Sequence, residues 1–165
     1  MTNPQHILIV CTGNICRSPM AEALFGAGFM RPGYSIESAG LAAQEGQPAD
    51  ACAVELMAAR GIDISSHRAR QLTQDMLERA SLILTMDRDQ QRMILDTWPA
   101  TCGRVELLGR WSDISIADPY KQGRPAFETA LGAIERGVSE WQHWFSTGKP
   151  KKRPVSIWHR VFKPG

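Results

Sequence analysis

The stretch HILIVCTGNICRSPMAE, residues 6–22, decides how the chain begins to fold. Residues 6–10 form a continuous aliphatic run, which is typical of a strand buried on both faces, as in a parallel sheet. Turn residues follow at 12–14, and residues 17–29 then place apolar side chains at helical spacing, with Pro19 suited to a first helical turn. The stretch therefore predicts a central strand that passes through a tight loop into a helix.

Short apolar runs and helical periodicities alternate along the rest of the chain. Further strands are predicted at residues 34–39, 81–86 and 105–108. Helices are predicted at residues 50–60, where Gly61 is the stop signal, and at residues 73–79, 88–97 and 127–145. This alternation favours an α/β fold in which an open parallel sheet carries helices on both faces.

Length and composition limit how the chain is organised. With 165 residues, of which 43% are hydrophobic, it is large enough for one domain with a real core and too short for two ordinary domains. No apolar run approaches the roughly 20 residues that span a bilayer, and the N-terminus lacks the basic-then-apolar order of a signal peptide. We therefore expect a single domain in the cytoplasm.

The net charge of +2 is unevenly distributed. Residues 148–165 contain six of the 19 Lys and Arg residues and no acidic residue, which leaves residues 1–147 with a net charge of −4. We therefore expect a mildly acidic domain over residues 1–147 and a separate basic tail over residues 148–165. An acidic domain argues against nucleic-acid binding.

The cysteines and histidines do not form the pattern of a metal site. The chain has four cysteines, at positions 11, 16, 52 and 102, and none of the pairs has the C-x-x-C spacing of a zinc site. The four histidines are scattered, and nothing else indicates a secreted, disulfide-linked protein. We expect reduced thiols, no metal and no cofactor.

Cys11 stands where the first predicted strand ends, and Arg17 and a hydroxyl residue follow at the start of the predicted helix. Backbone N–H groups of such a loop, together with a helix N-terminus, attract negative charge. The same field favours the thiolate form of a cysteine placed there. An arbitrary cysteine at a strand end is usually a core residue, but this combination instead predicts a nucleophile and a phosphate site in one loop.

The neighbours of Cys11 suit phosphoryl transfer. Arg17 can offer two parallel N–H bonds to phosphate oxygens, a geometry that lysine cannot copy. Ser18 can donate a hydrogen bond to the thiolate, which makes Cys11 a better leaving group. Gly13 permits close backbone approach, and Asn14 tolerates the left-handed conformation that a tight loop requires.

A phenolate leaving group needs a proton, which a positioned carboxylic acid can supply. Asp118 lies in a polar loop after the last predicted strand and is followed by Pro119. Asp-Pro alone is more often a turn than a catalytic pair. The accompanying thiol site makes Asp118 the candidate general acid.

Residues 10–22 closely resemble the active-site loop of the low-molecular-weight protein tyrosine phosphatases. Similar segments follow in the family's order at residues 37–40, 67–71, 82–87 and 118–120, so that the resemblance covers residues 5–147. It implies one domain with a four-stranded parallel sheet flanked by helices. The chemistry would lie in the loop after the first strand, without a metal.

The resemblance also implies roles for individual residues. Cys11 would be the nucleophile, Arg17 the phosphate-binding residue and Ser18 the partner of the thiolate, while Asp118 would act as acid in the first step and base in the second. Residues that support the loop by hydrogen bonds would be Asn14, Ser38 and His67. Substrate would contact Thr12, Gly13, Asn14, Ile15, Cys16, Leu41 and Tyr120.

Cys16 matches a second loop cysteine that can form a disulfide with the nucleophile and so protect it from irreversible oxidation. A passive small residue is the alternative interpretation, and the sequence does not decide between them.

The predicted pocket walls suit phosphotyrosine, because Tyr120 can stack on a substrate ring and Ile15 offers an apolar surface. Lys121 after Tyr120, and Leu41 after Ser-Ala-Gly, resemble the bacterial branch of the family that is associated with exopolysaccharide export. That branch implies phosphotyrosine proteins as partners, in particular a tyrosine autokinase at the inner membrane.

Three other functions compete with this interpretation. Arsenate reductase needs a close pair of further cysteines, whereas Cys52 and Cys102 lie fifty residues apart. A relative that removes phosphate from arginine has threonine at the position of Ile15, and isoleucine cannot form a hydrogen bond with a guanidinium group. A phosphotyrosine-binding module without turnover would not need the nucleophile, the arginine and the acid together.

The tail over residues 148–165 lies outside the resemblance. Its basic and apolar residues allow contact with an anionic membrane face or with an acidic kinase segment. A solvated extension is the favoured interpretation. Truncation at Thr147 distinguishes membrane contact from a solvated extension, because it abolishes membrane association only if the tail makes that contact.

Overall fold

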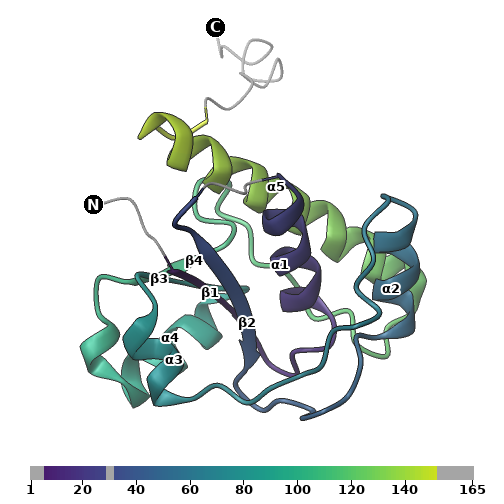
Figure 1. Cartoon of the computed structure of the whole chain (residues 1–165), viewed down its shortest axis with the longest axis horizontal. Helices are drawn as coiled ribbons and strands as arrows, with labels where there is room; N and C mark the ends of the chain where they lie inside the picture. Colours follow the sequence, from purple (N-terminus) through teal and green to yellow (C-terminus); the bar gives the residue numbers. More distant parts are fainter. Residues whose placement is uncertain (1–5, 29–31, 152–165) are drawn as a thin grey trace, which may run out of the picture.

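Four parallel strands form the sheet of the computed structural model, which describes residues 6–28 and 32–151 (Figure 1). The strands are β1 (His6–Cys11), β2 (Ser35–Gly40), β3 (Leu82–Thr85) and β4 (Val105–Leu107). Their order in the sheet is β2-β1-β3-β4, and every neighbouring pair is parallel. The predicted single-domain α/β fold with a four-stranded parallel sheet is confirmed.

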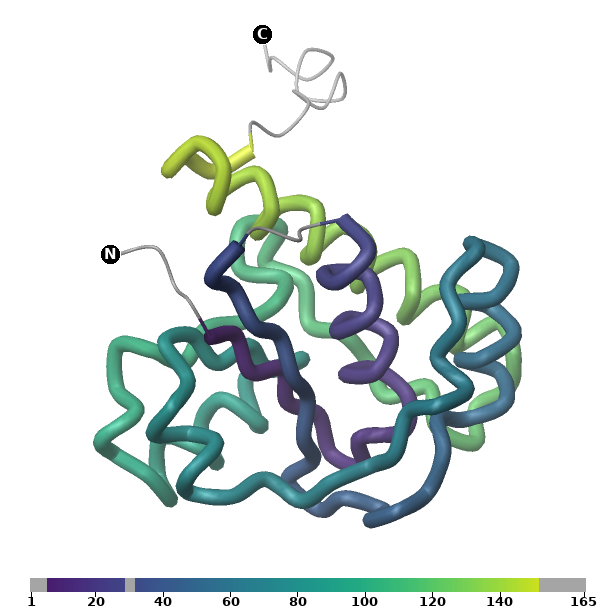
Figure 2. Tube along the Cα trace, in the orientation of Figure 1, coloured from purple at the N-terminus to yellow at the C-terminus, as the bar shows by residue number. Residues whose placement is uncertain are grey.

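The helices lie on both faces of this sheet. They are α1 (Arg17–Gly28), α2 (Ala51–Ala58), α3 (Gln74–Arg79), α4 (Arg88–Thr97) and α5 (Arg124–Thr147), with a 3₁₀ turn, η1, at Pro99–Thr101. Helices α1, α2 and α5 cover one face, and α3 and α4 cover the other (Figures 1 and 2).

The aliphatic side chains of β1 pack against the helices on both faces of the sheet. Ile7 and Ile9 point into the cluster that contains α1 and α5 side chains, whereas Leu8 and Val10 point into the cluster against α3 and α4. All four side chains are completely buried. Successive strand residues face opposite sides of a sheet, so a strand covered on both sides must be apolar at every position.

Helix boundaries differ from the sequence prediction by a few residues, for local reasons. Helix α2 begins one residue later than predicted, because Asp50 is its N-cap and accepts a hydrogen bond from the backbone N–H of Cys52 at 2.9 Å. Helix α5 begins at Arg124 rather than 127, since Pro125 fits the first helical turn. The 3₁₀ turn η1 was not predicted.

Helix α5 ends at Thr147, where Gly148 adopts a left-handed φ of 67° and donates its N–H to the carbonyl of Trp144. Residues 152–165, on which the predicted membrane contact depends, lie outside the described residues. The boundary between domain and tail at residues 147 and 148, and the role of the tail, therefore stay predictions.

Among the described residues, no helix combines the length and the apolar character that a membrane span needs.

Glu37 on β2 forms a charged cluster that ties the edge strand to its surroundings. Its carboxylate lies 2.6 Å from His6 Nε2 and 2.7 Å from a guanidinium nitrogen of Arg70. Partial burial alone would raise the pKa of Glu37, but the hydrogen bond with His6 and the charge of Arg70 outweigh it. The pKa of Glu37 therefore lies below its ordinary value of 4.5.

We expect the Glu37→Gln variant to lose about 1 kcal/mol of unfolding free energy at pH 7, because a partly screened, hydrogen-bonded charge is removed. A lowered carboxyl pKa stabilises the fold fully above pH 4.5, and this contribution disappears as the pH falls through the folded-state value. Urea unfolding of both proteins from pH 7 to pH 3 should show that the difference between their unfolding free energies disappears below pH 4.5. The exposed Glu45→Gln variant is the control, and a gap that does not depend on pH contradicts the prediction.

Candidate active site

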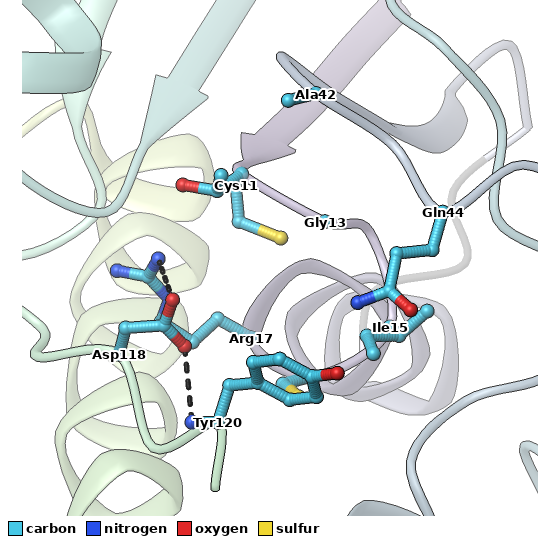
Figure 3. A pocket seen from close by; sticks show the side chains of 10 residues that line it. Cys11, Gly13, Ile15, Arg17, Ala42, Gln44, Asp118 and Tyr120 are labelled. Atoms are coloured by element: carbon cyan, nitrogen blue, oxygen red, sulfur yellow. Dashed lines mark hydrogen bonds and ion pairs between the residues drawn. The ribbon is translucent and has the colours of Figure 1, made fainter.

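A loop over residues 11–18, here called the phosphate loop, connects the end of β1 to the start of α1. One pocket opens beside it (Figure 3). Its walls are formed by Cys11, Thr12, Gly13, Ile15, Cys16, Arg17, Ala42, Gln44, Asp118 and Tyr120. The fold thus brings the predicted nucleophile, arginine and acid together from segments a hundred residues apart.

The backbone of the phosphate loop leaves donors available to an anion. None of the backbone N–H groups of residues 13–17 donates a hydrogen bond to another residue in the described part of the chain. Asn14 holds a left-handed φ of 56°, as predicted for a tight loop. Donors of this kind next to a helix N-terminus favour a bound phosphate group.

A chain of hydrogen bonds connects Ser38 and Asn14 to the Ser18 hydroxyl beside Cys11. Asn14 donates from Nδ2 to Ser18 Oγ at 2.8 Å and to Ser38 Oγ at 3.0 Å. Ser18 Oγ lies 2.9 Å from Cys11 Sγ. Because Ser18 already accepts from Asn14, its own hydrogen is free to be donated to the sulfur. The Ser18 hydroxyl can therefore donate a hydrogen bond to the Cys11 sulfur.

The same chain continues to Glu22, which the sequence interpretation missed. Ser38 donates its hydroxyl hydrogen to the Glu22 carboxylate, and this leaves the Ser38 oxygen to accept from Asn14. The carboxylate therefore fixes the direction of the Ser38 hydroxyl, which receives the Asn14 amide. Glu22 lies in the quoted stretch of residues 6–22, but only the contact with β2 reveals its role.

His67 supports the loop from another side. Its Nε2 lies 2.8 Å from the backbone carbonyl oxygen of Asn14. A carbonyl oxygen can only accept, so the hydrogen is on Nε2. The backbone N–H of Arg70 completes the support by donating to the Asn14 side-chain oxygen at 3.0 Å. Asn14, Ser38 and His67 thus lie where loop-supporting residues were predicted.

Arg17 is only 3% exposed and is held at its far end by the protein. It donates from one guanidinium nitrogen to the backbone oxygen of Ile116 at 2.8 Å, and the same nitrogen lies 3.4 Å from a carboxylate oxygen of Asp87. The other terminal nitrogen lies 3.4 Å from a carboxylate oxygen of Asp118. A buried guanidinium fixed in this way is preorganised, because it can present N–H groups to a phosphate without changing its rotamer.

Asp118 lies at the pocket wall with a side chain that is 48% exposed. Its other carboxylate oxygen accepts a hydrogen bond from the backbone N–H of Tyr120 at 3.1 Å (Figure 3). The carboxyl group is thus held between the Arg17 guanidinium and the backbone of Tyr120. The position suits a group that exchanges protons with substrate and water.

Cys16 lines the same pocket but differs chemically from Cys11. Burial raises the pKa of the Cys16 thiol well above its ordinary value, and the nearby charges of Asp50 and Cys11 raise it further. Cys16 is therefore an un-ionised thiol at neutral pH. Of the two loop cysteines, only Cys11 has a hydroxyl oxygen within hydrogen-bond distance of its sulfur.

The predicted residues do not all line the pocket. Asn14 and Ser18 belong to the phosphate loop but are completely buried and do not line the pocket. Leu41, predicted to contact substrate, packs against the core cluster on the α3 and α4 face. Ala42 and Gln44 from the same loop form the wall instead.

Asp87 also escaped the sequence interpretation, although a signal was present. It lies two residues after the end of β3, and the carboxyl ends of parallel strands meet at one edge of the sheet. An acidic residue at that position could therefore have been expected near Arg17.

Within the described residues, no group of three or more His, Cys, Asp and Glu side chains could hold a metal ion.

Comparisons with known proteins agree with this geometry. The family model of the low molecular weight phosphotyrosine protein phosphatases matches residues 6–151. A protein of Ralstonia nicotianae, named as a probable low molecular weight protein-tyrosine-phosphatase EpsP, is 53% identical over 135 residues, which are 82% of this chain and 92% of that protein.

Two solved structures have the same fold. The tyrosine phosphatase AmsI of Erwinia amylovora has a TM-score of 0.80 and 39% identity, covering 85% of this chain and 92% of that one. The YwlE arginine phosphatase of Geobacillus stearothermophilus has a TM-score of 0.81 and 31% identity, covering 87% of this chain and 94% of that one. With the family model matched across the whole described domain, this chain belongs to the low molecular weight phosphotyrosine protein phosphatase family.

Proposed function

We propose that Cys11, Arg17, Ser18 and Asp118 hydrolyse phosphotyrosine esters in proteins through a phosphocysteine intermediate. The observation that carries the proposal is the placement of the Cys11 sulfur beside the Ser18 hydroxyl, in one pocket with the Arg17 guanidinium and the Asp118 carboxyl group.

In the first step, the Cys11 thiolate attacks phosphorus and the bond between phosphorus and the tyrosine oxygen breaks. Asp118 donates its proton to the departing phenolate oxygen, so that tyrosine leaves as a neutral phenol. Arg17 and the loop N–H groups balance the charge on the three equatorial phosphate oxygens.

In the second step, water attacks the phosphocysteine. Asp118, now a carboxylate, takes a proton from the water, and the bond between phosphorus and sulfur breaks. Cys11 leaves as a thiolate, which the Ser18 hydroxyl stabilises by its hydrogen bond. Inorganic phosphate departs and Asp118 is again protonated.

The pocket walls support tyrosine rather than arginine as the carrier of phosphate. Ile15 and the Tyr120 ring present apolar surfaces on which a phenyl ring can lie. Ile15 has no hydrogen-bonding atom for a guanidinium group. The fold alone does not separate the two substrates, since an arginine phosphatase shares it.

We further propose that the partner is a membrane-associated bacterial tyrosine autokinase that controls exopolysaccharide production, and that the enzyme acts on it from the cytoplasm. Leu41 and the Tyr120-Lys121 pair match the branch associated with exopolysaccharide export. The names EpsP, AmsI and Wzb among the similar proteins support that assignment.

Phosphate release from three peptides tests the proposed activity. Without added metal, the wild-type protein should release phosphate from a phosphotyrosine peptide and leave matched phosphoserine and phosphoarginine peptides essentially intact. A phosphate assay at neutral pH, which leaves the acid-labile P–N bond of phosphoarginine intact, gives kcat/KM for each. A preference for phosphoarginine would show that the Ile15 wall does not set specificity as proposed.

A further inference from the structure

The loop over residues 41–44, which follows β2, is tied to the phosphate loop by its backbone. Leu41, Ala42 and Gln44 donate their N–H groups to the carbonyls of Cys11, Thr12 and Gly13, at 2.9, 3.0 and 3.0 Å. The two loops therefore run together along the pocket in fixed register. A side chain on the 41–44 loop has a defined position relative to the bound phosphate.

Two further features make this attachment rigid. Gly40 lies so close to the phosphate loop that a Cβ there would stand 2.6 Å from the carbonyl oxygen of Thr12, so only glycine allows the approach. The side-chain amide of Gln71 bridges the 41–44 loop, because it accepts from the Ala43 N–H at 2.9 Å and donates to the Leu41 carbonyl at 2.8 Å.

Gln44 is the polar side chain that this loop adds to the pocket wall. In the view of Figure 3, its amide lies next to Ile15, across the opening from Asp118. The side chain is half-buried, and its amide makes no hydrogen bond to another residue of the described chain. An amide that is partly removed from water and left without a protein partner gains from a ligand that supplies one.

We infer that the Gln44 carboxamide binds the peptide backbone of the substrate next to the phosphotyrosine. A phosphotyrosyl ring between Ile15 and Tyr120 fills the apolar part of the pocket and offers no donor or acceptor along its edge. The nearest polar groups of a protein substrate beyond the ring are backbone N–H and carbonyl groups. A carboxamide can donate to one and accept from the other.

This role separates the recognition of protein substrates from the chemistry. The contact lies on the side of the opening away from Asp118 and forms equally in the bound substrate and in the transition state. Such uniform binding lowers KM without changing kcat. The inference rests on the proposed phosphotyrosine activity and names Gln44 as its determinant of selectivity for peptides over small esters.

The test compares wild-type and Gln44→Leu proteins on a phosphotyrosine peptide and on phenyl phosphate, which has a phenol leaving group but no peptide backbone. We expect KM for the peptide to rise roughly two- to tenfold with kcat unchanged, as the loss of one net hydrogen bond implies. KM for phenyl phosphate should change less than KM for the peptide does, and a circular dichroism spectrum like that of the wild type shows that the variant is folded.

Gln47→Leu is the matched control, because Gln47 is exposed in the following turn and does not line the pocket. It should behave as wild type on both substrates. An unchanged peptide KM in Gln44→Leu, or an equal loss on both substrates, would overturn the role of Gln44. A wild-type protein that hydrolysed neither phosphotyrosine peptide nor phenyl phosphate would overturn the proposed function instead.

Discussion

The Cys11→Ser variant should lose turnover of a phosphotyrosine peptide by about 10⁴-fold or more, because a serine hydroxyl at neutral pH is a far weaker nucleophile than a thiolate. The substitution should leave phosphate recognition intact, since the loop N–H groups and Arg17 remain in place. Initial rates measure the loss, and fluorescence anisotropy with a labelled phosphopeptide measures the remaining binding.

Cys16→Ser provides the matched control, because it makes the same change in the same loop. Its thiol is kept un-ionised by burial, so the variant should retain most of the turnover. Rapid acid quench with ³²P-labelled substrate should trap phosphoenzyme in the wild-type and Cys16→Ser proteins and none in Cys11→Ser. Turnover surviving in Cys11→Ser, or phosphoenzyme lost in Cys16→Ser, would assign the nucleophile to the wrong cysteine.

Much of the fold could be predicted because its signals are local. The aliphatic run at residues 6–10 must be a strand covered on both faces, and the loop after it carries glycine, asparagine and a helix start in sequence order. Nucleophile, arginine and hydroxyl all lie within eight residues, so one strand-to-helix loop determines most of the chemistry.

The rest of the site depends on contacts that have no local signal. Glu22 reaches the site only through Ser38 on the neighbouring strand, and Asp87 only because β3 ends beside the phosphate loop. Leu41 and Gln44 belong to one short loop, and which of them faces the pocket is set by hydrogen bonds to the phosphate loop. The family resemblance indicated that the 41–44 loop reaches the pocket. The hydrogen bonds between the two loops determine which of its side chains forms the pocket wall.

The Asp118→Asn variant should lower kcat for a phosphotyrosine peptide by roughly 10²- to 10³-fold, because an amide cannot protonate the departing phenolate. The loss should be much smaller for para-nitrophenyl phosphate, whose more acidic phenol leaves without a proton. A series of aryl phosphates with graded phenol acidity measures this, and the variant should show a steeper dependence of rate on leaving-group acidity than the wild type.

Asp87→Asn separates proton transfer from the charge that both carboxylates place near Arg17. Asp87 and Asp118 each lie 3.4 Å from a guanidinium nitrogen, yet only Asp118 lines the pocket. Asparagine also keeps the capping interaction that Asp87 makes at the start of α4. If Asp118 is the acid, Asp87→Asn should change the rates of all aryl phosphates by a similar factor. A steeper leaving-group dependence in Asp87→Asn, with none in Asp118→Asn, would transfer the role of the acid to Asp87.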